Sequence, residues 1–100
     1  MRDNLTLAPE TLRDFCTRWM VAEFSFFGSV LRPDFRPDSD VDVLVSFSSE
    51  ARWSLLDLVK MQEELTAWFG RPTSIVEARA LRNPFRRAEI LRTRKILYAA

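Results

Sequence analysis

The alternation of apolar and polar positions predicts helices that alternate with strands. Apolar residues recur every three or four positions after Pro9, so residues 9–20 are expected to form a helix. Its inward stripe consists of Leu12, Phe15, Cys16 and Trp19. An aromatic-rich run at 21–27 and a valine-rich run at 41–47 have the composition of strands, and these two strands could pair directly.

The second half of the chain predicts a long helix first. Ser54, with Asp57 three residues later, resembles a capping box, and the helix that it opens should end at Gly70. The stripe expected to face the core consists of Leu55, Leu58, Val59, Gln62, Leu65 and Phe69, with one polar lapse.

A short strand and a last helix are expected to follow. Residues 73–78 resemble a strand, and Asn83 before Pro84 resembles the N-cap and first position of a helix reaching about residue 98. Its inward residues are expected to be Leu91, Leu97 and Tyr98. This order predicts a single domain, residues 1–100, of the α+β (α/β-like) class: a small sheet of three or more strands with helices packed on it.

Composition limits the available chemistry. The chain has no histidine and a single cysteine, which excludes Ser-His-Asp and Cys-His catalysis, His-ligated zinc and an intramolecular disulfide. No apolar run approaches the ~18–20 residues that span a bilayer, and the N-terminus lacks the apolar stretch of a signal peptide. We therefore expect a cytoplasmic protein with no membrane partner. Its chemistry must come from carboxylates, hydroxyls, Arg or Lys, and a hard metal ion.

Charge is unevenly distributed, although the net charge is only +1. Aspartates crowd residues 34–42, and arginines crowd the last quarter of the chain. The basic quarter could bind anions or an acidic partner, or it could be a solvated helix face. The overall charge is not that of a dedicated nucleic-acid binder.

Two carboxylates interrupt the otherwise apolar strand at 41–47. Asp40 and Asp42 are two positions apart, so their side chains should project from one face about 6.6 Å from each other. Burying both charges unpaired would be costly. Either the face is wet and the pair is incidental, or a cation lies between the two carboxylates. The second arrangement suits Mg²⁺, which proteins commonly bind through one or two carboxylates together with waters and substrate phosphates.

The Gly28-Ser29 pair follows the first strand, and it favours the interpretation in which a cation lies between the two carboxylates. Gly28 lets the backbone turn tightly and approach a ligand, and the free N–H groups of a helical turn starting there would face an anion. The Ser29 hydroxyl adds a donor, and Arg32 could neutralise a phosphate oxygen. Ser39 could orient Asp40. One loop could thus hold phosphates while the next strand holds the metal that bridges them.

The arrangement Gly-Ser-x10-Asp-x-Asp, with Arg four residues after the Gly and Ser before the first Asp, resembles the nucleotidyltransferase superfamily of DNA polymerase β. The short length and the segments "RPDSDVDVLV", "ARWSLLDLVKMQEEL" and "LRNPF" are similar to its minimal, antitoxin-type members, which are paired with HEPN-domain ribonuclease toxins. The resemblance implies a polymerase-β-type nucleotidyltransferase fold with a mixed sheet. It also implies that Asp40 and Asp42 are catalytic and bind Mg²⁺, and that Gly28 and Ser29 hold the β- and γ-phosphates.

The same resemblance implies a reaction and a partner. ATP would be the nucleotide donor, and AMP would be transferred to a hydroxyl, that of a tyrosine on a HEPN-type toxin, which the modification silences. A short chain of this kind is expected to complete its site with another subunit, in a hetero-oligomer or a homo-oligomer.

The chain departs from this family where a third carboxylate is expected. Ser74 stands at that position, and Glu77, three residues later, should face the opposite side of the strand unless a bulge re-aims it. The third acid helps hold a metal and deprotonate the attacking hydroxyl, and loss of general-base help costs roughly 10²–10⁴-fold in rate. Two functions therefore stay open: an adenylyltransferase that is slow or uses another base, and a nucleotide-binding antitoxin that neutralises its partner by binding alone.

Overall fold

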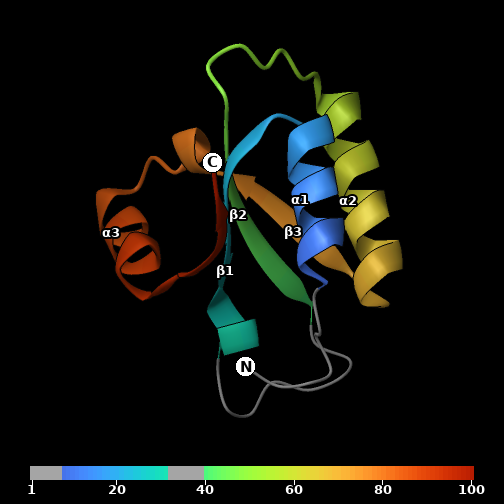
Figure 1. Ribbon diagram of the computed structural model, residues 1–100. Coiled ribbons are helices and arrows are strands. Elements are labelled where there is room, and N and C mark those ends of the chain that lie inside the picture. Colours follow the sequence, from blue (N-terminus) through green and yellow to red (C-terminus); the bar gives the residue numbers. More distant parts are fainter. Residues whose placement is uncertain (1–7, 32–39) are drawn as a thin grey trace.

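The computed structural model describes residues 8–31 and 40–100, and this part of the chain forms a mixed sheet with helices on both faces (Figure 1). The four strands lie in the order β3-β2-β1-β4. They are β1 (Val21–Phe27), β2 (Val41–Phe47), β3 (Thr73–Glu77) and β4 (Lys95–Ala99). β1 pairs antiparallel with both β2 and β4, and β2 pairs parallel with β3. The α+β class and the direct pairing of the first two strands are confirmed. The loop predicted from residue 32 lies outside the described residues as far as residue 39.

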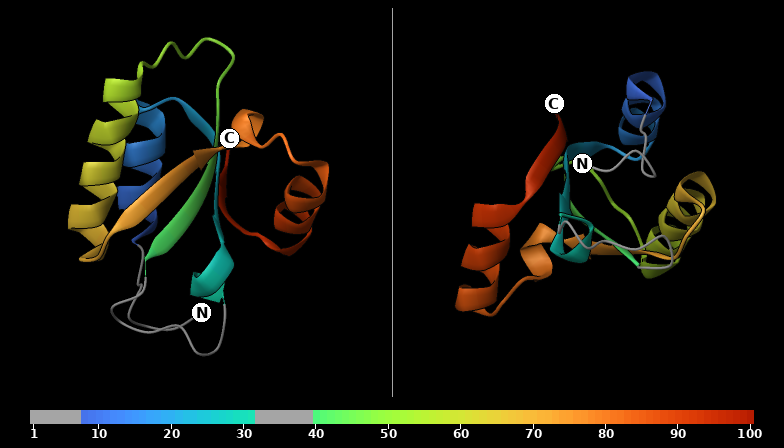
Figure 2. Two further views of the ribbon diagram at one scale, coloured as in Figure 1. Left: turned by 180° about the vertical axis from the view of Figure 1, so that it is seen from behind. Right: turned by 90° about the horizontal axis from the view of Figure 1, so that it is seen from below.

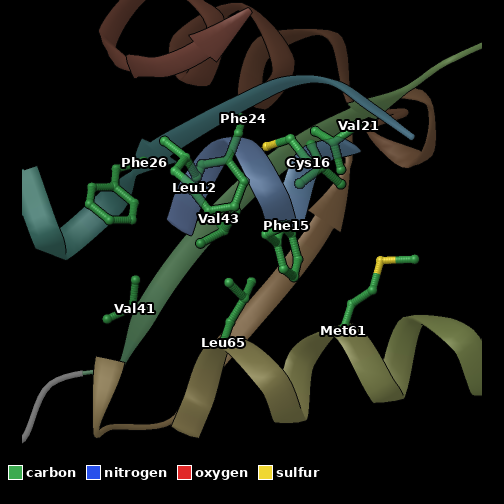
Figure 3. Close-up of a cluster of buried hydrophobic side chains, with 11 residues drawn as sticks. Leu12, Phe15, Cys16, Val21, Phe24, Phe26, Val41, Val43, Met61 and Leu65 are labelled. Atoms are coloured by element: carbon green, nitrogen blue, oxygen red, sulfur yellow. The ribbon is translucent and has the colours of Figure 1, made fainter. Parts of the chain in front are cut away.

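Helices α1 (Pro9–Arg18) and α2 (Leu55–Phe69) cover one face of the sheet (Figure 2). Between them and the sheet lies the first core cluster, most of which Figure 3 labels. Its buried members are Leu12, Phe15, Cys16, Val21, Phe24, Phe26, Val41, Val43, Val45, Met61 and Leu65. Burial raises the pKa of the Cys16 thiol to about 12, so this cysteine is a packing residue without nucleophilic character, as its place in the predicted stripe indicated.

The bounds of α2 agree with the prediction, but its buried stripe is rotated. Leu65 is buried and Leu58 and Phe69 pack on the first core cluster, whereas Leu55 and Val59 are 78% and 42% exposed. Met61 is buried in their place, because residues 58, 61, 65 and 69 together form the face that meets the sheet. The polar lapse at Gln62 has a structural role, since its Oε1 accepts a 2.9 Å hydrogen bond from the Ile75 backbone N–H.

Helix α3 (Pro84–Thr93) and the short 3₁₀ helix η3 (Ala78–Ala80) lie on the other face of the sheet (Figures 1 and 2). There they enclose the second core cluster, whose buried members are Phe27, Leu44, Ala78, Leu81 and Ile90. Asn83 caps α3 as predicted, because its Oδ1 accepts hydrogen bonds from the backbone N–H groups of Phe85 and Arg86.

The last helix is shorter than predicted, and the residues after it add a further strand to the sheet. α3 ends at Thr93, and the segment expected to continue it is instead strand β4. Arg94 turns the chain with extended backbone angles, and the following apolar residues pair with the open edge of β1. This pairing satisfies backbone groups on β1 that would otherwise lack sheet partners. Leu97 and Tyr98 do face inward, but onto the first core cluster and from a strand.

Within the described residues, no helix combines the length and the apolarity required to cross a lipid bilayer.

The capping box of α2 should contribute measurably to stability. The Ser54 side chain accepts from the Asp57 backbone N–H, and the Asp57 carboxylate accepts from the Ser54 N–H. Ser54→Ala is expected to lower the free energy of unfolding by about 1 kcal/mol, measured by urea denaturation. Ser54→Thr keeps the hydroxyl and is expected to stay within a few tenths of a kcal/mol of wild type. Equal stability of the Ala variant and wild type would contradict this assignment.

Candidate active site

The site begins at Gly28, where β1 ends and the 3₁₀ turn η2 (Gly28–Leu31) starts. Gly28 has a φ of +77°, and a β-carbon built on it would lie 2.8 Å from Asp42 Oδ2. A side chain at this position would force the Asp42 carboxylate to move, and the positive φ is itself strained for any residue other than glycine, so glycine suits a turn that rests against this carboxylate. The strand register explains the proximity, because Phe27 pairs directly with Asp42.

The two aspartates lie at the start of β2. Val41 and Val43 are fully buried in the first core cluster, so strand alternation directs Asp42 to the opposite face, where Leu44 joins the second cluster. Asp40 directly precedes the strand and is exposed. Burial raises the pKa of the Asp42 carboxyl, the negative charge of Asp40 raises it further, and the positive charge of Arg86 acts in the opposite direction. The structure therefore brings Asp40, Asp42 and Gly28 together, as the sequence predicted.

An open cavity of about 670 Å³ adjoins this group. Gly28, Leu31 and Asp42 line one side of it, and Arg86, Glu89 and Thr93 of α3 line the other. Its volume lies within the ~300–1,000 Å³ typical of ligand pockets. A small charged ligand placed here would contact the glycine turn, a carboxylate and a guanidinium together.

Arg86 is the site residue that sequence reasoning missed. The sequence indicates only that it belongs to the basic last quarter of the chain, yet it lines the same cavity as Asp42, and its positive charge opposes the rise in the pKa of Asp42. Its place in the first turn after Asn83-Pro84 could have been noted from the sequence. Its proximity to Asp42 could not, because that depends on how α3 packs across the sheet.

Of the other predicted nucleotide-binding residues, the structure describes only Ser29. Ser29 follows Gly28 in η2. Arg32 and Ser39 lie outside the described residues.

The structure does not bring Glu77 to the aspartates. Pairing of β2 with β3 runs without interruption from Val41–Thr73 to Val45–Glu77, so no bulge re-aims the side chain. Glu77 forms an ion pair with Arg79 and lines a separate cavity of about 250 Å³ with Trp53 and Leu58, on the α2 side of the sheet. Ser74 is exposed and pairs directly with Asp42, at the place where the third acid was expected. Within residues 8–31 and 40–100, no three His, Cys, Asp or Glu side chains form a group that could hold a metal ion.

The residues present nevertheless fit a magnesium–nucleotide complex. Carboxylate oxygens are the hard ligands that Mg²⁺ prefers, and this ion commonly takes one or two carboxylates with waters and substrate phosphates. Burial and the negative charge of Asp40 both raise the pKa of Asp42, and a cation bound beside the two carboxylates would relieve this unfavourable charge. The glycine turn and Arg86 suit the phosphates.

Two carboxylates at the start of β2 thus lie beside a glycine turn and an open charged cavity. The chain belongs to the nucleotidyltransferase domain family, whose family model matches residues 9–97. It is 37% identical over 79 residues to the protein adenylyltransferase MntA of Thermococcus cleftensis, a match that covers 79% of this chain and 75% of that protein. The protein is thus a nucleotidyltransferase, and the resemblance noted in its sequence is confirmed.

Solved structures agree in fold. A structure described as a minimal nucleotidyltransferase is 32% identical, with a TM-score of 0.67 over 92% of this chain and 96% of that chain. A toxin–antitoxin structure with AMP-PNP has a TM-score of 0.74 at 14% identity, over 94% of this chain and 75% of that chain. The second likeness concerns the fold alone.

Because the ionised Asp42 carboxylate is electrostatically unfavourable in the fold, replacing it is expected to stabilise the protein in a pH-dependent way. Because the folded-state pKa of Asp42 is raised, its ionised form destabilises the fold above that pKa, and this penalty disappears as the pH falls through it. Asp42→Asn is therefore expected to raise the melting temperature at pH 7 in EDTA by a few degrees, with the two proteins converging at acidic pH.

The matched control for this experiment is Glu63→Gln, which neutralises an exposed carboxylate on α2. It should not reproduce the pH-dependent difference. A lower melting temperature for Asp42→Asn than for wild type at pH 7 would show that the Asp42 charge does not destabilise the fold.

Proposed function

We propose that this domain is a cytoplasmic, Mg²⁺-dependent antitoxin that transfers AMP from ATP to a tyrosine hydroxyl of a partner HEPN-type toxin. The observation that carries the proposal is the contact of the Gly28 turn with Asp42 at the edge of the 670 Å³ cavity. This geometry lets one ligand touch a phosphate-binding turn and a metal-binding carboxylate at the same time.

Each residue of the site has a role in this proposal. Asp40 and Asp42 hold Mg²⁺, which when bound offsets phosphate charge and polarises the α-phosphate. Backbone N–H groups of Gly28 and Ser29 bind the β- and γ-phosphates. Nucleotide binding is completed by three further side chains, those of Arg32, Ser39 and Arg86. The acceptor oxygen forms a bond to the α-phosphorus, and the bond from that phosphorus to the bridging oxygen of the β-phosphate breaks, so pyrophosphate leaves.

The relatives support the donor and the partner. The similar protein of Thermococcus cleftensis is named a protein adenylyltransferase, which fits a protein hydroxyl as the acceptor. Several structurally similar chains come from toxin–antitoxin complexes, one of them with AMP-PNP, an ATP analogue. A toxin encoded beside this chain is accordingly the partner to test.

Covalent labelling tests the proposal directly. The domain, Mg²⁺ and the protein of the adjacent gene should incorporate label from ATP carrying radioactive phosphorus at the α-position, but none from ATP labelled at the γ-position. Asp40→Ala and Asp42→Ala should each abolish incorporation, because either change removes a ligand of the metal. Asp14→Ala, which removes an exposed aspartate on α1, should label like wild type. Peptide mass analysis should locate one AMP on a tyrosine. No α-label on the partner at any Mg²⁺ concentration would refute the proposal.

A second candidate is a nucleotide-binding antitoxin that neutralises its partner by binding alone. It is favoured by Ser74, an uncharged side chain paired with Asp42 where a third acid was expected. The variant with both Asp40→Ala and Asp42→Ala separates the two functions, with complex formation followed by gel filtration and toxin activity by RNA cleavage. The adenylyltransferase predicts that this variant binds the toxin without inhibiting it. Full inhibition by the variant, in the absence of ATP, would establish the second candidate instead.

A further inference from the structure

The site as described lacks a group to accept the proton of the attacking hydroxyl. Asp40 and Asp42 are assigned to the metal, Ser74 is not a base, and Glu77 lies on the other face of the sheet. Among the described residues that line the 670 Å³ cavity, two carry carboxylates, and these are Asp42 and Glu89. Glu89 comes from α3, an element that sequence reasoning did not connect with the site.

Helix geometry fixes the position of Glu89. Residues 86, 89, 90 and 93 of α3 follow the spacing of one helix face, and all four line the cavity. Ile90, within this face, is 6% exposed and packs in the second core cluster with Phe27 and Leu44, which holds the face against the sheet. Arg86, one turn before Glu89, acts electrostatically on Asp42. Glu89 therefore lies in the wall of the cavity, one helical turn beyond the arginine whose charge acts on Asp42.

The carboxylate of Glu89 is reachable from solvent. Arg92 Nη2 donates to Glu89 Oε1 in an exposed ion pair between residues one helical turn apart. A carboxylate has about four lone-pair sites, so this bond leaves acceptor capacity for a substrate hydroxyl. The Glu89 side chain is 62% exposed, as a base must be when its substrate is a side chain of another protein.

We propose that Glu89 is the catalytic general base of this nucleotidyltransferase, in place of the third strand carboxylate. The assignment rests on the proposed transfer of AMP. Glu89 takes the proton of the acceptor hydroxyl while that oxygen forms its bond to the α-phosphorus. The bond between the α-phosphorus and the bridging oxygen breaks with its electron pair going to pyrophosphate, and Glu89 later releases the proton to water. No further reactant is needed, so atoms and charge balance.

Glu89→Gln is the primary test, because it keeps the shape of the side chain and removes its basicity. The transfer rate at saturating ATP is expected to fall by roughly 10²–10⁴-fold. ATP and Mg²⁺ affinity, measured by calorimetry, should remain at the wild-type value, as should the melting temperature. Glu89→Asp, which keeps a carboxylate on a shorter stem, should retain part of the rate. Glu63→Gln on α2 serves as the matched control and should transfer AMP like wild type.

Two further variants separate catalysis from structure. Arg92→Gln breaks the ion pair but leaves the carboxylate, so it should cost far less rate than Glu89→Gln. Ser74→Asp restores a carboxylate opposite Asp42, and in the Glu89→Gln background it should recover part of the lost rate.

The outcomes distinguish this inference from the function on which it rests. Equal transfer by Glu89→Gln and wild type would overturn the base assignment and leave the proposed function intact. Equal losses in Arg92→Gln and Glu89→Gln would also overturn it, since the ion pair alone would then matter. Failure of the wild-type protein to label its partner would instead remove the proposed function, and the assignment of Glu89 with it.

Discussion

The close approach of the Gly28 backbone to the Asp42 carboxylate is the constraint on which the site depends. Antiparallel pairing of β1 with β2 sets Phe27 opposite Asp42, and the missing β-carbon of Gly28 then lets the turn rest on the carboxylate oxygen. Any side chain there would have to displace the acid or the turn. The turn proposed to bind phosphate and the carboxylate proposed to bind the metal are thus held together by the sheet itself.

The two faces of β2 divide stability from chemistry. On one face, Val41, Val43 and Val45 are almost completely buried and hold the strand in register. On the other, Asp42 is half-buried beside Asp40, which is electrostatically unfavourable and is reflected in its raised pKa. Such tension is common where a protein prepares a binding site for a charged ligand, because the ligand supplies the missing countercharge. Three buried valines on the same short strand make that tension tolerable.

Local signals explain what the sequence could predict. The capping box at Ser54, the glycine stop at Gly70 and the Asn83-Pro84 helix start are short-range patterns, and the structure reproduces each of them. The failures are all non-local. The segment of β4 continues a helical pattern, and only the open edge of β1 makes it a strand. Arg86 and Glu89 became candidates only when the packing of α3 placed them beside Asp42. The buried stripe of α2 differs from the predicted one, because packing against the sheet decides which of several apolar residues are buried.

At the edge of the sheet formed by β3, side chains of α2 occupy backbone donors of the strand. β3 is a terminal strand, and an unprotected terminal strand offers backbone donors to which a second molecule can add its own strand. Here the Gln62 side chain takes the N–H of Ile75, and the Thr66 hydroxyl accepts a 3.3 Å hydrogen bond from that of Thr73. α2 thereby occupies donors that strand addition would require. These two hydrogen bonds protect part of the β3 edge against pairing with a strand of another molecule.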